Sequence, residues 1–260
     1  MINSLNKMPV LFIGHGSPMN AIEDNSYTEE WSEIAKKLPR PKAILSISAH
    51  WYTSGSRIND ETSPKMIYDM FGFPKELYNL KYPVSGAPEL AHLTKELLGT
   101  EIVIDNTWGI DHGTWSVLCK MFPEADIPVF QLSIDRNASA EEHYKLGKKL
   151  NSLREEGVLI LGSGNVVHNL ALVDFDMEAG FPWAEEFDSF IKEKIEQRKY
   201  NDVIHYEKAG QVSKIAFHSP DHYYPLLYVL GASEEQDKLN IYNASCVFGS
   251  LSMTCYLFGL

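Results

Sequence analysis

The sequence predicts an α/β fold with parallel strands. Residues 10–13 and 43–49 are short apolar runs of the kind that form buried strands. Between them, residues 28–38 carry apolar side chains at helical spacing. A strand, a helix and a second strand within about 40 residues indicate a parallel βαβ unit. The 260 residues contain no internal repeat and no break in composition, so one domain spanning residues 1–260 is expected.

The remaining elements follow from apolar spacing and turn residues. The helix over residues 28–38 is expected to begin with Thr28 as its N-cap and to end before Pro39. Ser139, followed by acidic residues in the next turn, is expected to open another amphipathic helix. Further helices are predicted over residues 88–98, 139–155 and 183–199, with one more ending at residue 122. Further strands are predicted over residues 102–104, 128–134, 158–161 and 250–257, the last at a sheet edge.

A long loop is expected over residues 52–88, which are rich in proline, glycine and tyrosine and show little periodicity. A loop of this length in a compact domain is more often functional than idle. Its aromatic side chains either form the wall of a pocket or pack the loop onto the domain. These side chains are Tyr68, Phe71, Phe73, Tyr78 and Tyr82.

Composition excludes several classes of partner. The formal net charge of −12 argues against binding to nucleic acid or to anionic membrane surfaces, both of which attract basic proteins. No apolar run approaches the roughly 20 residues of a membrane helix, and no signal-peptide pattern is present. The three cysteines form no CxxC pair, which favours reduced thiols and a cytoplasmic location.

Histidines follow the predicted strands at the points where these strands end. His15 lies between two glycines after the first strand, and His50 follows the second. Because parallel strands of a βαβ unit finish at the same edge of the sheet, both imidazoles are expected to lie close together there. Open α/β sheets bind ligands outside the carboxyl ends of their strands, and neutral imidazole is the commonest side-chain metal ligand. His15 and His50 are therefore candidate metal ligands.

Three further histidines stand beside glycines or turn residues. His168 and His222 are candidate ligands of the same metal, since a catalytic metal keeps about three protein ligands and an open position. His112 is a candidate for proton handling beside the metal. His218 either lines the same pocket or belongs to an ordinary loop. The histidines in polar stretches are expected at the surface: His92, His143 and His205.

Other catalytic motifs are missing from the chain. No HExxH motif is present, and Gly162-Ser163-Gly164 lacks the third glycine of a dinucleotide fingerprint. Ser17 does not fit the nucleophile-elbow pattern. Ser163 is therefore interpreted as a small residue in a tight turn. The histidine motifs remain as the feature that carries chemistry.

In sequence order, these motifs resemble those of class III extradiol ring-cleavage dioxygenases, in the branch similar to 4,5-DOPA dioxygenase extradiol. The resemblance runs from about residue 9 to the C-terminus. Five segments carry it: Gly14-His15-Gly16-Ser17-Pro18, Ser48-Ala49-His50-Trp51, Gly109-Ile110-Asp111-His112-Gly113, Gly164-Asn165-Val166-Val167-His168-Asn169 and Pro220-Asp221-His222-Tyr223.

The resemblance implies a three-layer α/β/α fold with a mixed, mostly parallel sheet and a metal site at the carboxyl ends of its strands. It implies metal ligation by His15, His50 and His222. It gives His168 the role of catalytic acid/base, or of a fourth ligand when zinc is bound. His112 is expected to line the substrate site, and His218 and Tyr223 flank the motif of the third ligand and are expected to contact substrate.

The implied activity is the opening of a catechol ring by O₂ beside the diol. Fe²⁺ is expected for this reaction, although three imidazoles also suit Zn²⁺, which has no redox chemistry. More distant members of the class use a glutamate where His222 stands. Two other interpretations use the same histidines: a zinc-dependent hydrolase with a metal-activated water, and a protein that binds metal without turnover.

Overall fold

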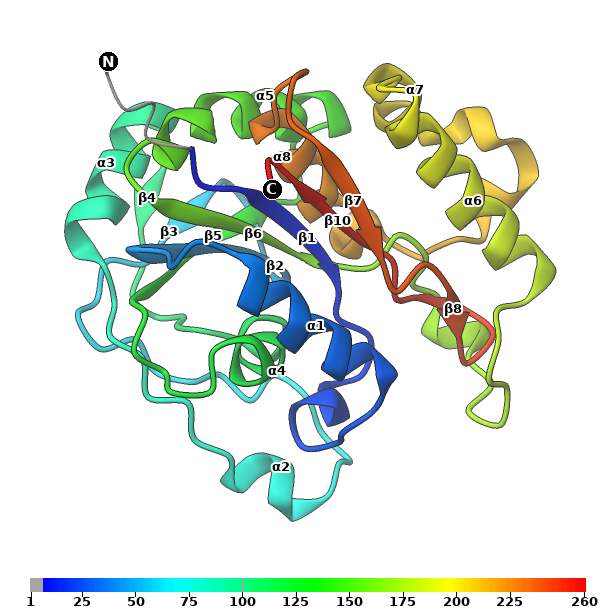
Figure 1. Ribbon diagram of the computed structural model, residues 1–260, viewed down its shortest axis with the longest axis horizontal. Helices are drawn as coiled ribbons and strands as arrows, with labels where there is room; N and C mark the ends of the chain where they lie inside the picture. Colours follow the sequence, from blue (N-terminus) through cyan, green and yellow to red (C-terminus); the bar gives the residue numbers. More distant parts are fainter. Residues whose placement is uncertain (1–6, 100) are drawn as a thin grey trace.

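A computed structural model describes residues 7–99 and 101–260, and a mixed eight-stranded sheet lies at its centre (Figure 1). The order of its strands is β4-β3-β5-β2-β6-β1-β10-β7, and β8 and β9 form a separate pair. The bounds of the strands are β1 (Val10–Gly14), β2 (Ala43–Thr53), β3 (Arg57–Ile58), β4 (Val103–Ile104), β5 (Val129–Asp135), β6 (Val158–Gly164), β7 (Leu239–Tyr242), β8 (Cys246–Val247), β9 (Leu251–Ser252) and β10 (Cys255–Phe258).

Helices surround this sheet. The α-helices are α1 (Ser26–Lys37), α2 (Lys75–Asn79), α3 (Pro88–Leu98), α4 (His112–Met121), α5 (Ala140–Leu150), α6 (Pro182–Glu196), α7 (Tyr200–Ile204) and α8 (Tyr224–Ala232). Short 3₁₀ segments are η1 (Pro18–Ala21), η2 (Asn151–Arg154), η3 (Leu170–Leu172), η4 (Tyr206–Lys214) and η5 (Pro220–His222).

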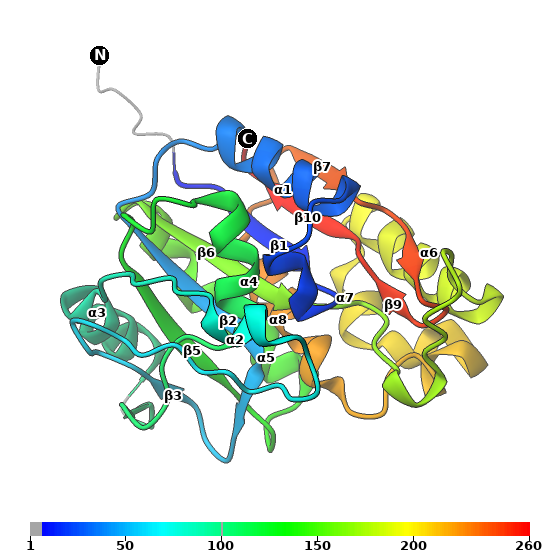
Figure 2. The same ribbon diagram turned by 90° about the horizontal axis from the view of Figure 1, so that it is seen from below.

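The predicted α/β fold with three layers is confirmed. Figures 1 and 2 show α5 and α8 on one face of the sheet and α1 and α4 on the other. Side chains alternate between two buried cores because both faces of the sheet are covered. Phe12 and Leu45 belong to the core under α8, whereas Leu11 and Ile44 belong to the core under α4.

The central strands β5, β2, β6 and β1 run parallel, as the βαβ pattern predicts. The two strands of the predicted βαβ unit are not neighbours, because β6 lies between β1 and β2 and pairs with both. All three strands still end at the same edge of the sheet. The residues at the ends of β1 and β2 can therefore meet although the two strands are not neighbours.

The expected sheet edge at the C-terminus is also corrected. β10 is an internal strand, antiparallel to β1 on one side and to β7 on the other. The edge strand is β7, whose four residues are all only half-buried and so show no clean apolar alternation in sequence. A sequence pattern cannot reveal an edge strand that lacks a buried face.

Several helix boundaries differ from those expected, and the helix expected over residues 183–199 is α6 (Pro182–Glu196). α1 begins at Ser26, because Asn25 is its N-cap and Thr28 completes a capping box from the third helical position. The helix after Ser139 ends at Leu150 and continues as the 3₁₀ segment η2. Ser139 is its N-cap, as predicted.

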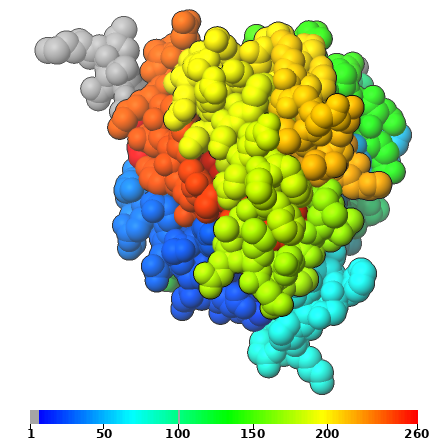
Figure 3. Space-filling model, turned by 90° about the vertical axis from the view of Figure 1, so that its right-hand side faces the viewer, coloured from blue at the N-terminus to red at the C-terminus, as the bar shows by residue number. Residues whose placement is uncertain are grey.

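The long segment over residues 52–88 contains more structure than a loop, since β2 extends into it and it includes β3 and α2. Tyr82 ties it to the domain by donating a hydrogen bond to the carbonyl oxygen of Phe122 (2.8 Å), whereas Tyr68 packs near Trp115 and donates to the carbonyl oxygen of Leu80 (2.6 Å) within the segment. Figure 3 shows the part of this segment around α2 projecting at the lower edge of a face that the α6–α7 region covers. None of the helices in the described part of the chain has the length and apolar character that crossing a bilayer requires.

Candidate metal centre

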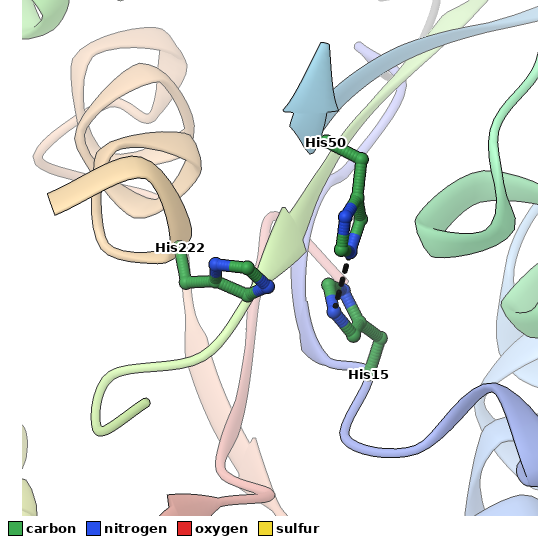
Figure 4. Close-up of side chains that lie close together, drawn as sticks. All are labelled: His15, His50 and His222. Carbon is green, nitrogen blue, oxygen red and sulfur yellow. Dashed lines mark hydrogen bonds between the residues drawn. The ribbon is translucent and has the colours of Figure 1, made fainter. Parts of the chain in front are cut away.

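Three histidines from separate elements converge at the carboxyl edge of the parallel strands. His15 follows β1, His50 lies near the end of β2 and His222 ends η5. One ring nitrogen from each lies within 4.8 Å of the other two, and the Nε2 atoms of His15 and His50 are 3.3 Å apart. Figure 4 shows the ring of His222 pointing toward the other two rings. The predicted meeting of His15 and His50 is confirmed.

The β2 strand reaches this edge with an irregularity. Its pairing with β5 shifts register between Ile47 and Tyr52, and the strand continues to Thr53. His50 therefore lies inside a bulged part of β2 rather than directly after it, which corrects the expected strand end. Bulges of this kind often re-aim a side chain beside an active site.

His222 reaches the site because β6 carries glycine where another chain segment crosses it. A Cβ atom on Gly164 would lie 2.1 Å from the carbonyl oxygen of His222, which no side chain can tolerate. The same oxygen accepts a hydrogen bond from the backbone N–H of Asn165 at 2.9 Å. The glycine thus lets η5 lie directly against the end of β6. The motif predicted as a tight turn is part of this strand.

Ser163, between the glycines of β6, faces the opposite side and orients His15. Its hydroxyl donates to the carbonyl oxygen of Gly113 at 2.5 Å and lies 2.9 Å from Nδ1 of His15. Because the hydroxyl proton is already committed, Nδ1 of His15 is the donor in the second contact. The Nε2 atom of His15 is then unprotonated in the neutral ring, with its lone pair toward the other two histidines.

Carboxylates lie beside the Nδ1 atoms of the other two rings. Oδ2 of Asp221 lies 2.5 Å from Nδ1 of His222, and Oδ2 of Asp69 lies 3.2 Å from Nδ1 of His50. The Nε2 atom of His222 is buried and has no hydrogen-bond partner among the described residues. Three imidazoles with their Nδ1 atoms so held and their Nε2 atoms directed to one point form a set that fits a metal ion.

The electrostatics of the site favour neutral rings. Burial, with further contributions from neighbouring imidazoles, holds the pKa of His15 and the pKa of His50 well below the ordinary value for histidine. Burial and the adjacent ring of His222 also lower the pKa of His168 well below that value. Neutral imidazoles are the form that binds metal and the form that accepts a proton.

His168 and His112 lie beside the three converging rings. The ring of His168 stacks on that of His222 with centroids 3.4 Å apart, and its backbone N–H donates to the carbonyl oxygen of Ala216 at 2.8 Å. His168 is not among the rings whose nitrogens converge within 4.8 Å. Nδ1 of His112 lies 2.9 Å from Oδ2 of Asp69, the same oxygen that approaches His50.

His112 is the first residue of α4, and a buried network holds this helix end in place. Asp111 is the N-cap, and its side chain accepts from the backbone N–H of Thr114 at 3.3 Å and from the amide of Gln131. Burial, with a contribution from Asp69, raises the pKa of Asp111 to about 6. The network fixes where the His112 ring stands above the sheet.

A cavity of about 350 Å³ opens over the metal site. Its apolar wall includes Phe71 and Phe73 from the long segment, so part of the predicted aromatic wall is present, whereas Tyr68 and Tyr82 pack elsewhere. Phe71, Leu170 and Phe175 are largely exposed at this site. The residues that line the cavity are His15, Gly16, Ser17, Pro18, His50, Asp69, Met70, Phe71, Phe73, His112, His168, Leu170, Phe175, His222, Phe248 and Leu251.

Two predicted substrate contacts are not brought to this cavity. Tyr223 is fully buried in the core, where its hydroxyl donates to the carbonyl oxygen of Val203 at 2.7 Å, so the residue after His222 points away from the site. His218 is exposed and does not line the cavity. The consecutive residues of a 3₁₀ turn face different directions, and proximity in sequence did not decide which one enters the site.

The expectation that the remaining histidines lie at the surface is confirmed only in part. His92 is exposed, and His205 is half-buried. His143 is fully buried, which contradicts the prediction. Its Nδ1 lies 3.0 Å from the hydroxyl of Tyr228, because α5 packs against the fully buried helix α8.

The orienting residues Asp69, Ser163 and Asp221 were missed by the sequence reasoning. Asp221 stands next to a candidate ligand, which is a signal that could have marked it. Ser163 lies between two glycines in a strand. Its side chain therefore had to point to the face opposite to the one on which a side chain at either glycine would lie. Asp69 lies in an aperiodic segment and gave no signal.

The fold and this site define a class of protein: an α/β protein with three converging imidazoles at the carboxyl edge of its sheet, a set that fits a metal ion. The model of the family described as the catalytic LigB subunit of aromatic ring-opening dioxygenase matches residues 9–259. The chain therefore belongs to the LigB family and is an extradiol aromatic ring-opening dioxygenase.

Named relatives agree over nearly the whole chain. The chain is 44% identical to the 4,5-DOPA dioxygenase extradiol of Escherichia coli K12, with 97% of this chain and 95% of the relative covered. It is 40% identical to the protein of the same name from Beta vulgaris, with 95% of each covered. A crystal structure of an uncharacterised Escherichia coli K12 protein matches with a TM-score of 0.84 at 40% identity, covering 97% of this chain and 100% of that one.

Proposed function

We propose that His15, His50 and His222 hold an Fe²⁺ ion at which the protein opens a catechol with O₂. The observation that carries this proposal is the buried Nε2 atom of His222, which has no partner in the described structure and faces two further imidazoles. An orphaned buried nitrogen is costly unless a ligand satisfies it. The names of the relatives suggest catechols of the DOPA type as substrates.

Bound iron supplies the route by which electrons pass between the catechol and O₂, which zinc cannot supply. We propose that the flat ring of the catechol lies between the apolar side chains of the cavity and the metal site, with His112 and His168, which line the cavity, beside it. We propose that His168 is the catalytic acid/base. Its lowered pKa keeps the ring neutral at pH 7, so one of its nitrogens accepts a catechol hydroxyl proton and later returns it.

His112 is proposed to contact the substrate from the other side. We propose that the ring proton lies on Nδ1, which is 2.9 Å from Oδ2 of Asp69. The Nε2 atom is then an acceptor, suited to the second hydroxyl of a catechol. The proposal includes Zn²⁺ as an alternative occupant of the site, because three imidazoles do not select iron over zinc. His168 would then be its fourth ligand.

Two histidine variants separate the roles. His222→Ala is expected to lose the bound metal and, with it, activity. His168→Gln is expected to retain metal while turnover falls at least about a hundredfold, the range for loss of a general acid/base. His92→Gln, at an exposed histidine outside the site, is the control and is expected to keep both. Loss of metal in His168→Gln would instead make His168 a ligand first.

We also propose that residues 1–260 form a single catalytic domain that acts in the cytoplasm. In support, the sheet takes β1 from the start of the chain and β10 from its end, side by side. The three cysteines are unpaired, and two of them are buried, as is usual in a reducing compartment.

A further inference from the structure

Asp188 is a buried carboxylate that the proposed reaction does not use. It lies on α6, is 4% exposed and does not line the cavity over the metal site. None of the ion pairs among the described residues includes it. A buried charge without a cation is costly to the folded state. Its place in the core therefore calls for a role other than stabilising the fold.

Two hydroxyl groups from one short segment hydrogen-bond to this carboxylate. Oγ of Ser252 donates to Oδ1 of Asp188 at 2.5 Å, and Oγ1 of Thr254 donates to Oδ2 at 2.8 Å. Ser252 is the last residue of β9, and α6 packs against this strand (Figure 2). The two bonds thus hold residues 250–254, which we name the β9 segment, against α6.

The β9 segment in turn holds the backbone on both sides of His168. The N–H of Ser252 donates to the carbonyl oxygen of Val167 at 3.0 Å, and the N–H of Asn169 donates to that of Ser250 at 3.1 Å. The hydroxyl of Ser250 also donates to the carbonyl oxygen of Asn169 at 2.8 Å. The position of His168 therefore depends on where the β9 segment lies.

The same segment is connected to His222. The side-chain amide of Asn165 donates to the carbonyl oxygen of Ser252 at 2.7 Å, and its backbone N–H donates to that of His222 at 2.9 Å. The rings of His168 and His222 stack with centroids 3.4 Å apart. A shift of the β9 segment would therefore change how the first ring faces the second and the metal site.

We propose that Asp188 is a positioning residue for the reaction and that, through the β9 segment, it holds His168 where it can exchange a proton with the substrate. This inference rests on the proposed function, because it assumes that His168 is the acid/base. A carboxylate suits the task because each of its oxygens accepts one of the two hydroxyl protons. An asparagine amide has one acceptor oxygen and cannot accept from both.

The first test is the turnover of Asp188→Asn in the iron-loaded protein. Its kcat should fall about tenfold or more, because a small misplacement of a catalytic group is costly, while KM and metal affinity stay close to the wild-type values. Ile191→Val is the matched control, since it removes a methyl group from a fully buried residue on the next turn of α6. The control should keep its kcat. Wild-type kcat in Asp188→Asn, or an equal loss in the control, would overturn the inference.

A second variant covers the case in which Asp188→Asn does not fold. Thr254→Val keeps the shape of the side chain and removes one of the two donors to the carboxylate. Its kcat should fall as well, by a smaller factor and again without loss of metal. Wild-type kcat in this variant would contradict the inference.

A comparison of backgrounds distinguishes positioning of His168 from a general loss of structure. In His168→Gln, the addition of Asp188→Asn should lower the residual turnover no further, because Asp188 acts only through His168. If Asp188→Asn lowers turnover by the same factor in both backgrounds, it acts independently of His168 and the inference is wrong.

Amide hydrogen exchange separates this inference from the proposed reaction. It is measured by mass spectrometry on the iron-loaded protein without O₂ or catechol. In Asp188→Asn, the amides of Asn169 and Ser252 should exchange about tenfold faster than in the wild type, whereas Ile191→Val should leave them unchanged. If the wild type cleaves no catechol, the proposed function fails, and exchange still shows whether Asp188 holds the backbone around His168. Unchanged exchange at both amides would contradict the inference.

Discussion

The hydroxyl of Ser163 accepts a hydrogen bond from Nδ1 of His15 at 2.9 Å, on the face of β6 opposite to the one where Gly164 admits His222. The strand β6 thus positions His15 from one of its faces and His222 from the other. Ser163 is the residue through which the sheet fixes the tautomer of His15, since its own proton goes to the carbonyl oxygen of Gly113.

Ser163→Ala is expected to weaken metal binding by about tenfold, because His15 loses the acceptor that holds its proton on Nδ1. Ser46→Ala is the control, since Ser46 is equally buried in the sheet and bonds to Thr114 at 2.7 Å rather than to a histidine. Competition with a chromophoric chelator gives the dissociation constant of each variant. Equal losses in the two variants would show that Ser163 acts only through packing.

Asp69→Asn is expected to weaken metal binding by about 10- to 100-fold, because one carboxylate oxygen serves both His50 and His112. Asp60→Asn provides the comparison. Asp60 lies 3.0 Å from the exposed His92 and is a carboxylate–imidazole contact outside the site. Competition with the same chelator gives the metal affinity of both variants. Wild-type metal affinity in Asp69→Asn would show that Asp69 does not support metal binding.

Gly164→Ala is expected to displace His222, because the added Cβ would lie 2.1 Å from the backbone oxygen of that residue. The expected result is a loss of about 1–3 kcal/mol in the free energy of unfolding together with weaker metal binding. Gly210→Ala is the control, since its positive φ is strained but no atom lies within 4 Å of the added Cβ. The control variant should lose stability but keep its metal affinity. Urea unfolding measures the first quantity and metal titration the second. Full metal affinity in Gly164→Ala would contradict the argument.

Much of the fold followed from the sequence because its signals are local and periodic. The apolar runs that became β1, β2 and β6 carry their own boundaries, and parallel strands bring their end residues to one edge. The positions of His15 and His50 could therefore be predicted. The position of β6 between β1 and β2 could not, since strand order depends on contacts that no local pattern encodes.

The residues that failed prediction did so for identifiable physical reasons. Tyr223 was placed at the site because it follows His222, yet its ring turns into the core beside Phe187 and Phe217. Asp69 acts from a segment without periodicity. His143 sits in a polar helix, and only the packing of α5 on α8 reveals that it is buried.

Because His143 is buried, the free energy of unfolding is expected to fall at acidic pH. Burial lowers the pKa of His143 from 6.5 to about 4, so between these values the unfolded chain binds more protons than the folded one. The stabilisation is present above pH 6.5 and is lost as the pH falls toward 4. At pH 5 the loss amounts to about 2 kcal/mol relative to pH 7.5.

Urea unfolding of the metal-free protein at pH 7.5 and pH 5 tests this. In His143→Phe the drop in the free energy of unfolding between the two pH values should be smaller than in the wild type by about 2 kcal/mol. The other buried histidines are present in both proteins, so their contribution cancels in the comparison. An identical drop in both proteins would mean that His143 does not titrate between its folded and unfolded states as described.

The most direct test of the central claim, that the three-histidine site holds iron for extradiol cleavage, is reconstitution of metal-free protein with either Fe²⁺ or Zn²⁺ under anaerobic conditions. A catechol and O₂ are then added while oxygen uptake and the absorbance of the ring-opened product are recorded together. The account predicts one O₂ consumed per product formed with iron, and neither signal with zinc. Tight zinc binding with no oxygen uptake by the iron-loaded protein, over a panel of catechols, would contradict it and leave hydrolysis by a zinc-activated water as the chemistry of this site.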